Sequence, residues 1–76
     1  MQRYKGELVG CGRTAECIVM ASPTGGWLIY EENLPEGVYA LKFGDWHPKN
    51  PNGVLKRGQA RRGRDGRWAV EDVRDA

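Results

Sequence analysis

The feature that most limits the fold of this chain is how often turn-forming residues interrupt it. Short apolar runs that hold β-branched and aromatic residues alternate with segments rich in Gly, Pro, Asn and Ser. The turn segments are residues 12–14, 22–26 and 33–37. The pattern requires no helix, and it predicts strands joined by short connections into an antiparallel meander. These strands are expected at residues 4–11, 15–21, 27–32 and 38–43.

Side-chain alternation predicts which faces of these strands are buried. Tyr39, Leu41 and Phe43 share one face of the run 38–43 and form the better core candidate. The run 15–21 is apolar on both faces, which is expected inside a closed barrel or sandwich rather than at a free edge. We therefore expect an all-β fold, a small antiparallel barrel or sandwich-like sheet of about five or six short strands, similar in size to SH3-like and OB-like domains.

The segment KRGQARRGRDGRW, residues 56–68, carries six positive charges and one negative charge. Asp65-Gly66 lies between two strand-like runs and favours a hairpin with a type I′ turn, which needs positive φ at both central residues. The apolar pattern resumes at Trp68, so a strand suits the end of the chain better than a helix. We expect a basic hairpin over residues 54–73 whose first strand has little to bury. It would extend beyond the core as a partly exposed ribbon, held at its base by Leu55, Trp68 and Val70.

The charge distribution makes this hairpin the first candidate for contact with a partner. Residues 1–55 carry five Lys or Arg and six acids, whereas residues 56–76 carry seven against four. Arg binds phosphate or carboxylate through a planar fork, and a two-stranded ribbon can enter the major groove of DNA or follow an RNA backbone. The alternative is a solvated surface that keeps the domain soluble. The predicted contact residues are Lys56, Arg57, Arg61, Arg62, Arg64 and Arg67.

An irregular loop is expected at residues 44–53, and it contributes two further candidates. Trp46 is expected either to anchor a protein interface or stack on a base, or to fold back and cap the open end of the barrel. His47 lies two residues after Asp45, but this spacing does not establish an acid/base pair, and an exposed histidine is expected. Trp46 and His47 complete the set of predicted contact residues.

The two cysteines and the single histidine limit the metal and redox chemistry. A turn centred on Thr14 would place Cys11 and Cys17 opposite one another, where a disulfide is conceivable. Buried, reduced thiols are the favoured alternative, because free Cys is commonly buried. A structural zinc site needs four Cys or His ligands, and this chain has three. We expect no metal and no other cofactor.

Catalysis is not expected. No Gly-rich loop leads into a helix with Lys-Ser or Lys-Thr, as a phosphate-binding loop requires. The adjacent carboxylates at residues 31–32 and 71–72 face opposite ways on a strand, so neither pair converges on a substrate. The chain has no apolar run of ~20 residues and no signal-peptide pattern, which predicts a single cytoplasmic domain, residues 1–76, without membrane contact.

Two classes of function remain. In the first, a non-enzymatic module binds nucleic acid, or a nucleic-acid-processing complex, through the Arg-rich hairpin, with Tyr or Trp adding stacking. In the second, an inhibitor or adaptor of phage or mobile-element type docks on an acidic surface of a host protein through the hairpin and the Trp46 loop. The isoelectric point of about 8.7 argues slightly against a dedicated non-specific nucleic-acid binder.

Overall fold

The computed structural model describes residues 3–31, 33–44 and 56–75, and these contain six strands and no helix. The all-β prediction is confirmed, and each expected strand is present with slightly different ends. The strands are β1 (Arg3–Gly10), β2 (Arg13–Ala21), β3 (Trp27–Tyr30), β4 (Gly37–Gly44), β5 (Lys56–Arg62) and β6 (Trp68–Asp75).

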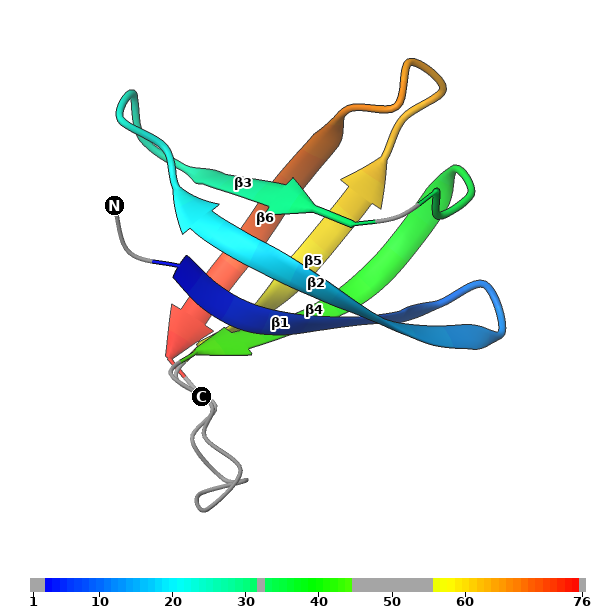
Figure 1. Cartoon of the computed structure of the whole chain (residues 1–76), viewed down its shortest axis with the longest axis horizontal. Coiled ribbons are helices and arrows are strands. Elements are labelled where there is room, and N and C mark those ends of the chain that lie inside the picture. Colours follow the sequence, from blue (N-terminus) through cyan, green and yellow to red (C-terminus); the bar gives the residue numbers. More distant parts are fainter. Residues whose placement is uncertain (1–2, 32, 45–55, 76) are drawn as a thin grey trace.

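All six strands belong to one antiparallel sheet that is curled into a half-barrel, with the order β3-β2-β1-β4-β5-β6. In Figure 1, β1, β2 and β3 cross β4, β5 and β6 at a steep angle. The expected meander is wrong at one step, because β4 pairs with β1 and not with β3. Six residues separate β3 from β4, enough to span about 20 Å and so to connect an outermost strand of the sheet to an inner one. Leu34 of this connection is buried in the core.

The core fills the concave side of the sheet. Tyr39, Leu41 and Phe43 are at most 2% exposed, which confirms the predicted core face of β4. Each large apolar side chain buried in this way contributes roughly 1.5–3 kcal/mol to stability. Trp27, Trp68 and Val70 pack against this core from the side. The buried set is Leu8, Cys17, Val19, Ile29, Leu34, Tyr39, Leu41, Phe43 and Ala60.

The convex side of the sheet faces solvent, which corrects the expectation that β2 is buried on both faces. Cys17 and Val19 point into the core, but Ile18 between them is 41% exposed. A half-barrel has one layer, and none of the described strands packs on its outer face. The curl itself depends on glycines on the inner face of β1. A Cβ atom at Gly10 would lie 2.6 Å from the carbonyl oxygen of Val38, closer than such atoms can approach.

The first hairpin turns at Cys11-Gly12, where φ is 51° and 73°. Positive φ at both central residues is the type I′ geometry of a two-residue loop, and Gly10 accordingly pairs with Arg13. The turn is therefore not centred on Thr14, and Cys17 lies opposite Gly6 rather than Cys11. Both thiols are free; Cys17 is buried as predicted, whereas Cys11 is exposed.

The last hairpin is present, but its turn is not of type I′. Gly66 has a φ of 82°, and Asp65 is not among the described residues with positive φ. The Gly63 amide donates to the Arg67 carbonyl at 2.9 Å and the Gly66 amide donates to the Gly63 carbonyl at 3.1 Å. This is a three-residue loop built on a type I turn with one left-handed glycine. Asp-Gly thus marked the hairpin correctly but not its backbone geometry.

Candidate functional site

The basic hairpin is part of the sheet and not a free ribbon. β5 pairs with β4 over its whole length, from Lys56 opposite Phe43 to Arg62 opposite Gly37, and its other side pairs with β6. The expectation that β5 extends beyond the core was therefore wrong. Its inner face carries Gly58 and the fully buried Ala60, so the strand packs without large apolar side chains of its own. Trp68 and Val70 pack on the core as expected, and Leu55 lies outside the described residues.

Alternation along β5 divides the predicted basic residues between two faces. Ala60 points inward, so Arg57 and Arg61 lie on the convex face, where both are exposed. Lys42 of β4 is directly opposite Arg57 on one side, and Arg74 of β6 is directly opposite it on the other. Residues in such pairs point to the same side of the sheet. We call these four residues, Lys42, Arg57, Arg61 and Arg74, the outer basic face.

A bulge in β6 brings Arg74 to this face. The pairing of β5 with β6 shifts register between Arg57 and Gln59, and Asp72 has a φ of 56°. Without the extra residue Arg57 would lie opposite Val73. The bulge instead lets Val73 pack on the core and places Arg74 beside Arg57.

Sequence reasoning missed Arg74 and Lys42. A bulge leaves no clear mark in the sequence, so Arg74 could not be assigned to either face of the hairpin. Lys42 did have a signal, because it lies between the predicted core residues Leu41 and Phe43, and alternation places such a residue on the outward face.

The outer basic face places like charges side by side. Directly opposed residues have Cβ atoms about 4.5–5.5 Å apart, and like charges at that separation are destabilising. The ammonium group of Lys42 lies 3.2 Å from a carboxylate oxygen of Glu7. Arg57, Arg61 and Arg74 have no ion-pair partner among the described residues. Three guanidinium groups are thus available to an anion from solution.

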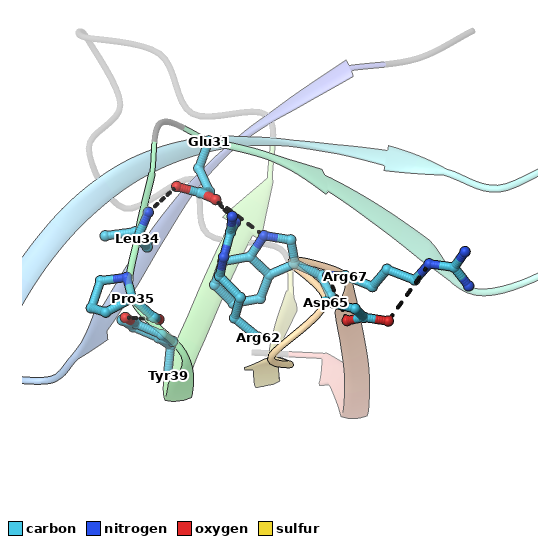
Figure 2. Close-up of polar contacts among 8 residues, drawn as sticks. Glu31, Leu34, Pro35, Tyr39, Arg62, Asp65 and Arg67 are labelled. Atoms are coloured by element: carbon cyan, nitrogen blue, oxygen red, sulfur yellow. Dashed lines mark hydrogen bonds and ion pairs between the residues drawn. The ribbon is translucent and has the colours of Figure 1, made fainter.

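Arg62 is separate from this face and lies where β3 and β6, the two outermost strands, approach each other (Figure 2). We call the contact of Glu31, Arg62 and Trp68 the seam. Its Nη1 donates to Oε1 of Glu31, whose side chain is only 1% exposed. The same carboxylate accepts the indole N–H of Trp68 at 3.3 Å and the Leu34 amide at 2.9 Å. The Arg62 guanidinium also lies over the Trp68 ring, 5.6 Å from its centroid. Arg62 therefore joins β5 to the end of β3 and is separate from the outer basic face.

The other predicted contact residues differ in whether they already lie near a carboxylate of the protein. The ammonium group of Lys56 donates to Asp75 at 2.8 Å, and this hydrogen bond and charge lower the pKa of the Asp75 carboxyl. Arg64 is exposed at the hairpin tip. Arg67 is also at the tip, with an 89% exposed side chain whose Nε is 3.7 Å from Asp65. Figure 2 shows Arg67 extending away from the seam.

The loop residues and the cysteines, which were the remaining candidates, form no binding or metal site within the described residues. Trp46 and His47 lie outside the described residues. Burial raises the pKa of the Cys17 thiol to about 12, with Glu31 and Glu7 adding to the effect, so this thiol is protonated at neutral pH. In the ranges that the structure covers, no three or more His, Cys, Asp or Glu side chains are grouped to hold a metal ion. Nor do these ranges include a helix that is long and apolar enough to cross a membrane.

Comparison of the chain with protein-family models, curated proteins and solved structures found no match. Its function has to be inferred from its own residues.

Proposed function

We propose that this protein is a non-enzymatic binding module whose outer basic face contacts nucleic acid, with Arg64 and Arg67 at the hairpin tip adding to the contact. One observation carries the proposal: Arg57 lies directly between Lys42 and Arg74 on an exposed face. This arrangement costs stability in the free protein. A bound polyanion would remove that repulsion, and sites that break a local rule of stability are commonly functional.

The chemistry of the face suits phosphate groups. A guanidinium binds phosphate oxygens in bidentate fashion, and an exposed Arg does so without first losing a partner. Arg57 and Arg61 are four residues apart on one strand, which separates their Cα atoms by roughly 13 Å. Lys42 and Arg74 broaden the cluster across the sheet. The face therefore offers positive charge both along β5 and across the strands, and it could contact several phosphates at once.

The second candidate is an inhibitor or adaptor of phage or mobile-element type that docks on an acidic protein surface. The observation in its favour is the setting of Arg61, which lies between Val38 and Ala69. Val38 is 48% exposed, and Arg beside exposed apolar side chains is common in protein interfaces.

Binding of a fluorescent oligonucleotide as a function of salt tests the proposal. The double variant Arg57→Gln/Arg74→Gln removes two charges from the outer basic face. Arg3→Gln/Arg13→Gln is the matched control, because both arginines are exposed on the β1–β2 hairpin and the change in net charge is identical. We expect the first variant to lose much more affinity than the control. The slope of log affinity against log salt should also become less steep by roughly 1.8, since each lost phosphate contact removes about 0.9.

Two results would contradict the proposal. Equal losses in the two variants would mean that net charge alone attracts the oligonucleotide. No binding at low salt, together with salt-sensitive binding to an acidic protein, would favour the second candidate.

A further inference from the structure

Except for Tyr30, the aromatic rings of the described residues are turned away from the outer basic face. Tyr4, Trp27 and Phe43 pack edge to face in the concave interior, with ring centroids 4.9–6.2 Å apart. Tyr39 and Trp68 form a second pair at 5.4 Å. Proteins that bind single strands rely on aromatic platforms for their bases, each worth about 1–3 kcal/mol. The rings that could serve this purpose are instead occupied by core packing.

Within the ranges that the structure describes, Tyr30 is the exposed aromatic residue, and it lies in a different part of the sheet. It is 55% exposed and directly opposite Ile18 on β2, in an apolar region that also includes Leu28. In sheet order β3 is four strands from β5. The row of residues between Arg57 and Arg61 on this face consists instead of Ala40, Gln59 and Glu71. None of these side chains can stack on a base.

The breadth of the sheet keeps the outer basic face out of a groove. A two-stranded ribbon fits the major groove of B-DNA, which is about 12 Å wide. Here β5 is flanked by β4 and β6, and β4 continues into β1. Three strands already span about 10 Å between backbones before side chains are added. Arg57 and Arg74 are therefore held at the level of the phosphates and cannot reach the base edges.

The spacing of the cations suits two phosphate backbones on either side of a groove. Lys42, Arg57 and Arg74 form a row across the strands, and Arg61 lies roughly 13 Å from Arg57 along β5. This separation is close to the ~12 Å width of the major groove. Glu7 lies directly opposite both Lys42 and Glu16, so carboxylates border the row on β1 and β2. This border favours β4, β5 and β6 as the place for an anion, where Glu71 opposite Gln59 is the acid among the outward positions paired with β5.

From these observations we infer that the outer basic face binds double-stranded nucleic acid through its phosphates, without reading base sequence. The row of Lys42, Arg57 and Arg74 contacts one backbone, and Arg61 with the hairpin tip contacts the other. This inference rests on the proposed function, because it specifies the form of nucleic acid that the same face takes.

The test compares a 20-base-pair DNA duplex with either of its single strands at one low salt concentration, using the whole protein. We expect the duplex to bind roughly tenfold more tightly or better, with a log–log salt slope between about −3.6 and −5.4 for four to six phosphate contacts. A second duplex of unrelated sequence should bind within a factor of about two, since backbone contacts carry no sequence information.

Variants separate failure of this inference from failure of the proposed function. Tyr30→Ala removes the exposed aromatic ring of the described residues, and Trp46→Ala removes the one aromatic ring outside them; neither should change duplex affinity. Preference for the single strand, lost in either variant, would overturn the inference while leaving nucleic-acid binding intact. Absence of binding to both probes would overturn the proposed function as well. Far-UV circular dichroism of each variant confirms that the sheet is retained.

Discussion

Arg62 of β5 donates a hydrogen bond to the buried carboxylate of Glu31 at the end of β3. These strands belong to opposite halves of the curled sheet, and the ion pair joins them where the indole of Trp68 also binds the same carboxylate. The basic segment thus has two different tasks. Arg62 stabilises the fold from inside, whereas Arg57 and Arg61 face solvent.

Loss of the Glu31 carboxylate should destabilise the fold strongly. Glu31→Ala leaves the Arg62 guanidinium without its anion in a partly buried site, and breaking such a pair costs about 3–5 kcal/mol. Glu31→Gln should cost less, because its amide oxygen still accepts the Leu34 amide. Urea unfolding measures both. Glu16→Ala is the control on the exposed face of β2 and should change the free energy of unfolding by less than about 0.5 kcal/mol. A loss of similar size in Glu31→Ala and Glu16→Ala would contradict the role of the seam.

Removal of charge from the outer basic face should not destabilise the protein. Arg57 lies directly opposite both Lys42 and Arg74, so Arg57→Gln relieves two like-charge contacts. We expect the free energy of unfolding at low salt to stay the same or to rise by a few tenths of a kcal/mol, about the size of one cross-strand pair. The difference should disappear at high salt, where exposed charges are screened. A loss of more than about 1 kcal/mol would show that Arg57 supports the fold, since surface changes without such a role stay within about 0.5 kcal/mol.

The two thiols should differ in reactivity. Cys11 is exposed in the first turn, whereas Cys17 is buried and its pKa is raised to about 12. In the native protein at pH 8 we expect an alkylating reagent to modify Cys11 alone, with Cys17 reacting only after unfolding. Mass spectrometry of intact protein counts the modified sites, and Cys11→Ser should leave none in the native state. Equal rates at both thiols would contradict the burial of Cys17.

The same pKa shift predicts a loss of stability at alkaline pH. The folded protein holds the Cys17 proton more tightly than the unfolded chain, whose thiol has the ordinary value of 9.0. Stability from this group is therefore fully present below pH 9.0 and declines as the pH rises toward about 12. Urea midpoints measured for the wild type and for Cys17→Ala should diverge in this range, with the wild type losing stability more steeply. Parallel curves would contradict the prediction.

Local patterns were enough to predict most of the strands and the core face. Alternation correctly assigned Tyr39, Leu41 and Phe43 to the interior, and Asp65-Gly66 marked the last hairpin, because side-chain alternation and turn residues act over a few positions. The crossing from β3 to β4 was not predictable in this way. It depends on curvature of the whole sheet, to which Gly6 and Gly10 contribute by allowing close approach on the inner face.

The candidate site was only partly predictable for a similar reason. Arg57 and Arg61 belong to a run of charge that is visible in the sequence, but the pairing of Arg62 with Glu31 spans thirty-one residues. A run of arginines does not show which of them has a buried partner. Arg74 joined the face only through the bulge in β6.

Gly58 should couple the fold to the outer basic face. A Cβ atom at this position would lie 3.0 Å from the Glu71 carbonyl oxygen and 3.2 Å from Cα of Val73, both of which are main-chain atoms of the bulged strand. Gly58→Ala must therefore shift the bulge that packs Val73 on the core and sets Arg74 beside Arg57, and overpacking of this kind costs about 1–3 kcal/mol. Gly63→Ala is the matched control, because the tight contact of its Cβ, at 3.0 Å, would be with the flexible end of the Asp65 side chain, and the Arg67 carbonyl oxygen would lie at an ordinary 3.8 Å. We expect Gly58→Ala to lower both the urea midpoint and the duplex affinity of the folded fraction, and Gly63→Ala to change neither by much. If Gly58→Ala lost stability but kept full duplex affinity, Arg74 would contribute nothing to binding, and the outer basic face would reduce to Lys42, Arg57 and Arg61.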